Sequence, residues 1–178
     1  IAGWTIGALV LLLFIRLDRP VSAWIARQSL AALLICAAAS SLVIVLLVLL
    51  PGLALQSWPV PQTWQENAIA AYPLEPIDPL NLEGAFSLGG TWLGMMAGAA
   101  LLFRKSGGFD TAGTPLQLFL RYLIGLGGVL LLWFGLGQLL PRSTDIAGNL
   151  LRFTRYVLIG SWISLAAPYI FRHLRLSR

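Results

Sequence analysis

Two groups of charged residues have types and spacings that suggest chemistry. Glu75, Asp78 and Glu83 are acids in one hydrophilic stretch, and carboxylates of this kind hold hard cations such as Ca²⁺. Because prolines and an asparagine flank these acids, turn formation explains them as well, and we favour it. Arg152 and Arg155 are spaced to share one helix face, where they would attract a lipid phosphate. Extension of both side chains to the lipid headgroups is the simpler interpretation, and we prefer it.

Histidine, lysine and cysteine each occur once, as His173, Lys105 and Cys36. A single histidine, far in sequence from any acid, does not fit a Ser–His–Asp set or a two-histidine metal site. A single cysteine inside an apolar run excludes an intrachain disulfide. The chain also lacks a glycine-rich phosphate loop followed by Lys and Ser or Thr. The sequence therefore predicts no catalytic, metal-ligating or cofactor-binding residue, and no cofactor.

The composition is that of an integral membrane protein. Of the 178 residues, 58% are hydrophobic and 11% are charged, whereas soluble domains carry about 25% charged residues. The net charge of +5 is spread over the chain, which fits a bias in membrane loops and not a nucleic-acid surface. We expect membrane lipids as partners and no nucleic acid.

Five apolar segments predict an all-α, polytopic helix bundle with five transmembrane helices, because helices satisfy their own backbone hydrogen bonds in lipid. The segments are 1–15, 29–50, 84–103, 116–140 and 150–171. The first would span about 22 Å, less than the roughly 30 Å of a hydrocarbon core. Its positive charges follow it, which is unlike a signal peptide. We therefore expect a spanning helix whose first turns are missing.

Basic residues fall mainly on one side if five helices alternate, and the positive-inside rule makes that side cytoplasmic. The C-terminus is then cytoplasmic in a multi-pass protein of the plasma (inner) membrane. The loop 51–83 contains no Lys or Arg and is expected outside. The expected cytoplasmic side carries Arg16, Arg19, Arg27, Arg104, Lys105, Arg121, Arg172, Arg175 and Arg178, and the other side carries Arg142, Arg152 and Arg155.

Small residues at four-residue spacing mark expected helix contacts. Gly3 and Gly7 form one such pair, and a second set predicts another close contact at Gly90, Gly94 and Gly98. Ala32, Cys36 and Ser40 form a weaker pattern of the same spacing, made of small residues other than glycine. These patterns indicate that the helices pack against one another.

The outer loop has prolines three residues apart, at Pro73, Pro76 and Pro79. This spacing suits a polyproline II strand and excludes a helix at that point. Trp58, Trp64 and Tyr72 suit the membrane–water boundary. A packed lid and a passive linker both remain open as roles for this loop.

The opening "IAGWTIGALVLLLFIRL" resembles the segment that follows the last catalytic motif of the type 2 phosphatidic acid phosphatase (PAP2) superfamily. Ala2, Gly3 and Gly7 match the A-G-x-x-x-G helix of that family. The segments 75–94, 120–136 and 151–171 resemble three helices that a prokaryotic branch adds to the six-helix core. The resemblance implies that 1–50 holds the last two core helices. It further implies that 51–83 is an extracytoplasmic Pro-rich loop and that 84–178 is a three-helix extension with a basic cytoplasmic tail.

The function implied by this resemblance is hydrolysis of lipid phosphate or diphosphate esters at the outer membrane face. In that family, one histidine attacks the phosphorus atom and a second histidine protonates the leaving alcohol, and no metal is needed. The family motifs K-x6-R-P, P-S-G-H and S-R-x5-H-x3-D are absent; Arg19–Pro20 lacks its lysine, because Leu12 occupies that position. No catalytic residue can therefore be transferred, and we expect the C-terminal part of a parent lipid phosphatase. A complete small membrane protein, acting as a scaffold subunit or facilitator, is the alternative.

Overall fold

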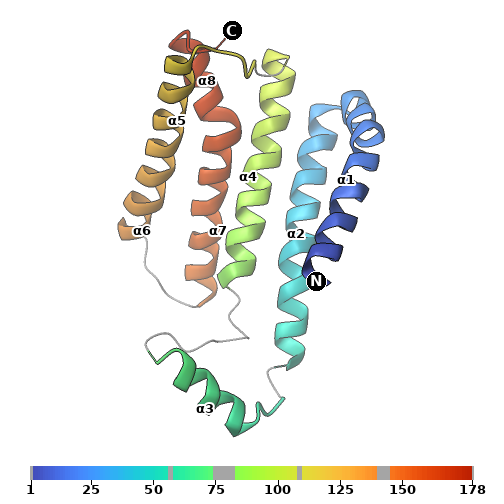
Figure 1. Cartoon of the computed structure of the whole chain (residues 1–178), viewed down its shortest axis with the longest axis vertical. Coiled ribbons are helices and arrows are strands. Elements are labelled where there is room, and N and C mark those ends of the chain that lie inside the picture. Colours follow the sequence, from blue (N-terminus) through green and yellow to red (C-terminus); the bar gives the residue numbers. More distant parts are fainter. Residues whose placement is uncertain (1, 56–57, 74–82, 108–109, 140–144, 178) are drawn as a thin grey trace.

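A computed structural model describes residues 2–55, 58–73, 83–107, 110–139 and 145–177 (Figure 1). Within these ranges the chain is helical and contains no strand. The predicted all-α membrane architecture is therefore confirmed. The apolar runs fold this way because a helix leaves no backbone group in need of an outside hydrogen-bond partner.

The helices follow one another as an up-and-down bundle with one short helix outside it (Figure 1). Two helices are interrupted by single π-helical turns, η1 and η2, and continue beyond them. In chain order the elements are α1 (Ala2–Arg27), α2 (Leu30–Leu55), α3 (Gln62–Ala71), α4 (Glu83–Ser106), α5 (Pro115–Leu130), η1 (Leu131–Gly135), α6 (Leu136–Leu139), α7 (Ile146–Ser161), η2 (Trp162–Ala166) and α8 (Ala167–His173).

Among the residues that the structure describes, three helices are long and apolar enough to cross a membrane: Leu30–Leu55, Glu83–Ser106 and Pro115–Leu139. The other two predicted spans are also helical, but both carry charged residues inside the helix. These are Arg16, Asp18, Arg19 and Arg27 in α1 and Arg152 and Arg155 in α7. The structure thus supports a polytopic protein, and the number of five spans stays a prediction.

The first helix is longer than expected. We predicted a connection after the apolar segment 1–15, yet α1 continues to Arg27 and passes through Pro20. The connection to α2 is reduced to Gln28 and Ser29. The charges end the apolar pattern but not the helix, because arginine and leucine are good helix formers.

The ends of the bundle differ in charge. Figure 1 shows that α1 ends, α2 begins, α4 ends and α5 begins at the same end as the C-terminus. The basic residues predicted to share a side therefore gather at this end, as far as the structure describes them. Glu83 and Arg152 lie at the opposite end, at the starts of α4 and α7.

The central helix is α4, which packs between α2 and α7 (Figure 1). The predicted glycine face makes the contact with α7: a Cβ added at Gly94 would overlap the carbonyl oxygen of Val157. The approach is mutual, since a Cβ at Gly160 of α7 would lie 2.5 Å from the carbonyl oxygen of Thr91. Missing side chains thus let the two backbones touch, as the spacing predicted.

The most buried part of the contact between α2 and α4 lies one position away from the face of α2 that we predicted, although Ser40 of the predicted face also accepts a hydrogen bond from Trp92 of α4. The buried residues of α2 are Ala37, Ser41 and Val45, one position further along than the predicted face through Cys36 and Ser40. Ser41 Oγ donates a hydrogen bond of 2.8 Å to the carbonyl oxygen of Gly89. This rotation leaves Cys36 exposed.

The predicted contact at Gly3 and Gly7 has no partner within the described residues, because nothing lies within 4 Å of a Cβ built at either position. The face is also apolar: Trp4 is 84% exposed and Phe14 is 70% exposed. Helix α1 therefore contributes an open small-residue face at the edge of the bundle.

The outer loop contains a helix that the sequence did not predict, α3, which lies across the end of the bundle in Figure 1. Trp58, Trp64 and Tyr72 are exposed, as suits the membrane boundary. Pro73 lies in a bend after α3. The predicted polyproline strand depends on Pro76 and Pro79, which lie outside the described residues.

Candidate functional site

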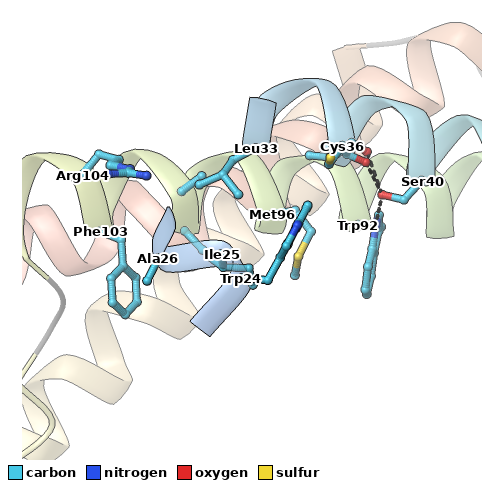
Figure 2. A pocket seen from close by; sticks show the side chains of 13 residues that line it. Trp24, Ile25, Ala26, Leu33, Cys36, Ser40, Trp92, Met96, Phe103 and Arg104 are labelled. Carbon is cyan, nitrogen blue, oxygen red and sulfur yellow. Dashed lines mark hydrogen bonds between the residues drawn. The ribbon is translucent and has the colours of Figure 1, made fainter. Parts of the chain in front are cut away.

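A groove with a volume of about 560 Å³ opens between α1, α2 and α4 (Figure 2). We call it the α2–α4 groove. Its volume is within the range of ligand pockets, and its walls are mainly apolar. The residues that line it are Trp24, Ile25, Ala26, Leu33, Cys36, Ala37, Ser40, Trp92, Met96, Ala99, Ala100, Phe103 and Arg104.

Helical spacing places the lining residues in two facing rows. On α4, Trp92, Met96 and Ala100 are four residues apart and therefore lie on one side of the helix. On α2, Cys36 and Ser40 form the matching row. The small side chains between the larger ones create the hollow.

The third wall comes from the last turns of α1, through Trp24, Ile25 and Ala26. In Figure 2 this segment lies beside Met96 of α4. It is present here only because α1 continues beyond its apolar segment. The longer α1 therefore adds a wall to the groove.

One end of the groove is closed by a hydrogen-bonded pair. Trp92 Nε1 donates to Ser40 Oγ at 2.8 Å, and Ser40 Oγ donates to the carbonyl oxygen of Cys36 at 2.7 Å (Figure 2). Both polar groups are thus satisfied, which an apolar environment requires. The pair fixes the indole against α2.

The other end carries a positive charge. Arg104 stands in the last turn of α4, at the end of the bundle where the basic residues gather. Its side chain is exposed and forms no hydrogen bond or ion pair with any described residue. None of the residues that line the groove is acidic. The site is therefore an apolar channel with one cationic end.

The two charged groups singled out in the sequence meet at the opposite end of the bundle. Arg152 Nη2 lies 2.7 Å from Glu83 Oε2, with the two side chains 21% and 29% exposed. The expected extension of Arg152 to the headgroups is therefore replaced by an ion pair within the protein. Arg155 lies over the ring of Tyr156, 5.2 Å from its centroid. Glu75 and Asp78 lie outside the described residues.

Arg121, which the sequence placed with the cytoplasmic charges, has a structural role. It is only 7% exposed, and its guanidinium donates to the carbonyl oxygens of Thr111 at 3.1 Å and Ala112 at 2.8 Å. Its Nε donates to the carbonyl oxygen of Leu176 at 2.9 Å. These bonds hold the loop before α5 and the C-terminal tail together.

The single reactive residues are dispersed. His173 is exposed at the end of α8, and Lys105 is exposed beside Arg104. Cys36 lies in the wall of the α2–α4 groove. The groove was not predicted from the sequence, because three separate helices form it. The four-residue spacing from Trp92 to Arg104 is the sequence feature that points to one of its walls.

The family described as PAP2 superfamily phosphatase, transmembrane extension, matches residues 86–178. This stretch runs from the first turn of α4 to the end of the chain. No curated protein and no solved structure shows significant similarity to the sequence.

Proposed function

Because the chain belongs to the PAP2 superfamily, through its transmembrane extension, we propose that it is the C-terminal membrane portion of a lipid phosphatase. The parent enzyme hydrolyses phosphate or diphosphate esters of membrane lipids at the outer face. Phosphatidic acid, phosphatidylglycerol phosphate and isoprenoid diphosphates are the substrate candidates. In this assignment, 1–50 supplies the last two core helices and 84–178 the appended bundle.

The family match over 86–178 is the observation that carries the proposal. It coincides with a structural unit, because α4, α5, α7 and α8 pack together in the described structure. Ser41 and Gly89 then join this unit to α2. The extension therefore has a fixed attachment to the helices that the proposal gives to the core.

The open face of α1 supports the same assignment. Gly94 of α4 sits against a neighbouring backbone, whereas Gly3 and Gly7 meet no described atom within 4 Å. In membranes such glycine pairs allow a second helix to approach closely. We assign this face to a core helix of the parent enzyme.

The charge distribution supports the orientation. In the proposal, the end that carries Arg104, Lys105 and Arg172 is cytoplasmic in the inner membrane. The end with Glu83 and Arg152 then faces outside, together with the start of α1 and the parent's active site. The chemical step belongs to the parent's histidine motifs, and the residues of this chain position helices.

The test compares two proteins: the chain 1–178 and the product of the complete reading frame that contains it. Phosphate release is measured with phosphatidic acid, phosphatidylglycerol phosphate and an isoprenoid diphosphate in mixed micelles. We expect turnover by the complete product and none by the chain. Turnover by the chain itself, or a complete frame without the three motifs, would overturn the proposal.

A scaffold subunit or facilitator is the second candidate. It is favoured by the way α2, α4 and α7 form a packed unit from this chain alone. A start codon immediately upstream of Ile1 would select this candidate, whereas an upstream frame that encodes the motifs would exclude it.

A further inference from the structure

We propose that the α2–α4 groove binds one acyl chain of an anionic phospholipid, with the lipid phosphate held by Arg104. The site lies between α1, α2 and α4 (Figure 2). It is separate from the proposed reaction, because Arg104 lies in the last turn of α4 whereas Glu83 begins the helix. The lipid is therefore a structural ligand of the protein and not its substrate.

The length of the groove matches one leaflet. Arg104 follows Trp92 by 12 residues on α4, which is about 18 Å at the helical rise of 1.5 Å per residue. Half of a hydrocarbon core is about 15 Å. With its phosphate at Arg104, a lipid would place the end of its acyl chain near the Trp92–Ser40 pair.

The lining of the groove suits a hydrocarbon chain. Its volume of about 560 Å³ lies within the range of ligand pockets. The lining at Met96, Ala99 and Ala100 is apolar, and methionine adapts its shape to a flexible partner.

The charge of the groove selects the headgroup. Arg104 has no partner among the described residues, and no acid lines the groove. A guanidinium binds phosphate oxygens through paired, charge-assisted hydrogen bonds. A phospholipid with net negative charge, such as phosphatidylglycerol, is favoured over zwitterionic phosphatidylcholine, whose choline would be repelled.

The experiment uses the product of the complete reading frame in nanodiscs and two photoreactive lipids. These are phosphatidylglycerol and phosphatidylcholine with the same diazirine-bearing acyl chain, and peptide mass spectrometry maps the adducts. We expect adducts from phosphatidylglycerol at groove residues such as Cys36 and Met96. Arg104→Gln should lower this labelling by about tenfold, the effect of losing one hydrogen bond to a charged group.

Lys105→Gln is the matched control, because Lys105 carries the same charge one position away and does not line the groove. It should leave groove labelling unchanged. Equal loss in Lys105→Gln and Arg104→Gln would show that only general surface charge matters and would overturn the proposal. Equal labelling by the two lipids, or adducts spread evenly over the exposed helix faces, would also overturn it.

A second pair of variants tests the channel itself. Ala100→Phe places a ring in the groove, whereas Ala38→Phe places one on an exposed part of α2 outside it. We expect Ala100→Phe to remove labelling at Cys36 and Ala38→Phe to preserve it, with both proteins retaining their helical circular dichroism. Unchanged labelling in Ala100→Phe would contradict an acyl chain in this channel. The readout is binding, so it is independent of phosphatase activity.

Discussion

Arg121 on α5 donates through Nε to the carbonyl oxygen of Leu176, 2.9 Å away in the C-terminal tail. The same guanidinium binds carbonyls of the loop before α5, including that of Ala112 at 2.8 Å. An arginine near the start of an apolar helix thus serves as the point where loop, helix and tail are joined.

Arg121→Met should destabilise this end of the bundle. The change removes the hydrogen bonds that the guanidinium donates to part-buried carbonyl oxygens, and we expect a loss of about 1.5–3 kcal/mol in the free energy of unfolding. Limited trypsin digestion in detergent should show faster cleavage at Arg175. Lys105→Met, on an exposed residue, is the control and should leave both measurements unchanged. If the Arg121→Met protein resists trypsin as well as the unsubstituted chain does, Arg121 does not hold the tail in place.

Gly94→Ala should weaken the contact between α4 and α7. The added methyl group would overlap the carbonyl oxygen of Val157, and such overpacking costs about 1–3 kcal/mol. Gly84→Ala is the matched control in the same helix, because nothing lies within 4 Å of a Cβ there. Unfolding in mixed micelles should separate the two, and equal midpoints would show that the close approach is not required.

Gly7→Leu should have different effects in the two forms of the protein. Within 1–178 the position is open, so we expect a change below about 0.5 kcal/mol. In the product of the complete frame, where we propose that a core helix packs on this face, the larger side chain should separate that helix from α1 and lower both stability and phosphate release. Gly127→Leu, also in open space, should be neutral in both proteins, and a neutral Gly7→Leu in the complete product would argue against a core helix on this face.

Glu83→Gln should cost about 1 kcal/mol, because its ion pair with Arg152 is short but partly exposed. A double-mutant cycle with Arg152→Gln measures the coupling directly. The coupling should shrink as salt is raised, since exposed charges are screened. A coupling energy near zero at low salt would show that the pair contributes no stability.

Some of this fold follows from pattern alone. Composition indicates an α-helical membrane protein, because lipid leaves the backbone few alternatives. The glycines at Gly90, Gly94 and Gly98 marked a contact that the structure confirms, since three glycines at four-residue spacing leave one face of α4 without side chains. A glycine pattern that marks a single helix face therefore predicts the helix contact correctly.

Other features could not be predicted for physical reasons. Helix α2 has small residues on every side between Cys36 and Ser41, so four-residue spacing did not single out one face, and our choice was off by one position. The predicted end of the first helix was wrong, because polarity and helicity are separate properties. Arg16 ends the apolar run but does not end the helix. The groove depends on how three helices meet, which no single segment encodes.

The π-helical turn Trp162–Ala166 lets one continuous helix serve two neighbours. Before it, Gly160 lies against α4; at and after it, Trp162 Nε1 donates to the carbonyl oxygen of Gly125 at 3.0 Å, and the ring of Phe171 approaches the same glycine of α5. Such a turn accommodates one extra residue within a single helical turn, so the helix continues on the same axis with its later side chains rotated. Removing one residue from it would rotate everything downstream by about 100°, turning Phe171 away from α5 while leaving the contact of Gly160 with α4 in place.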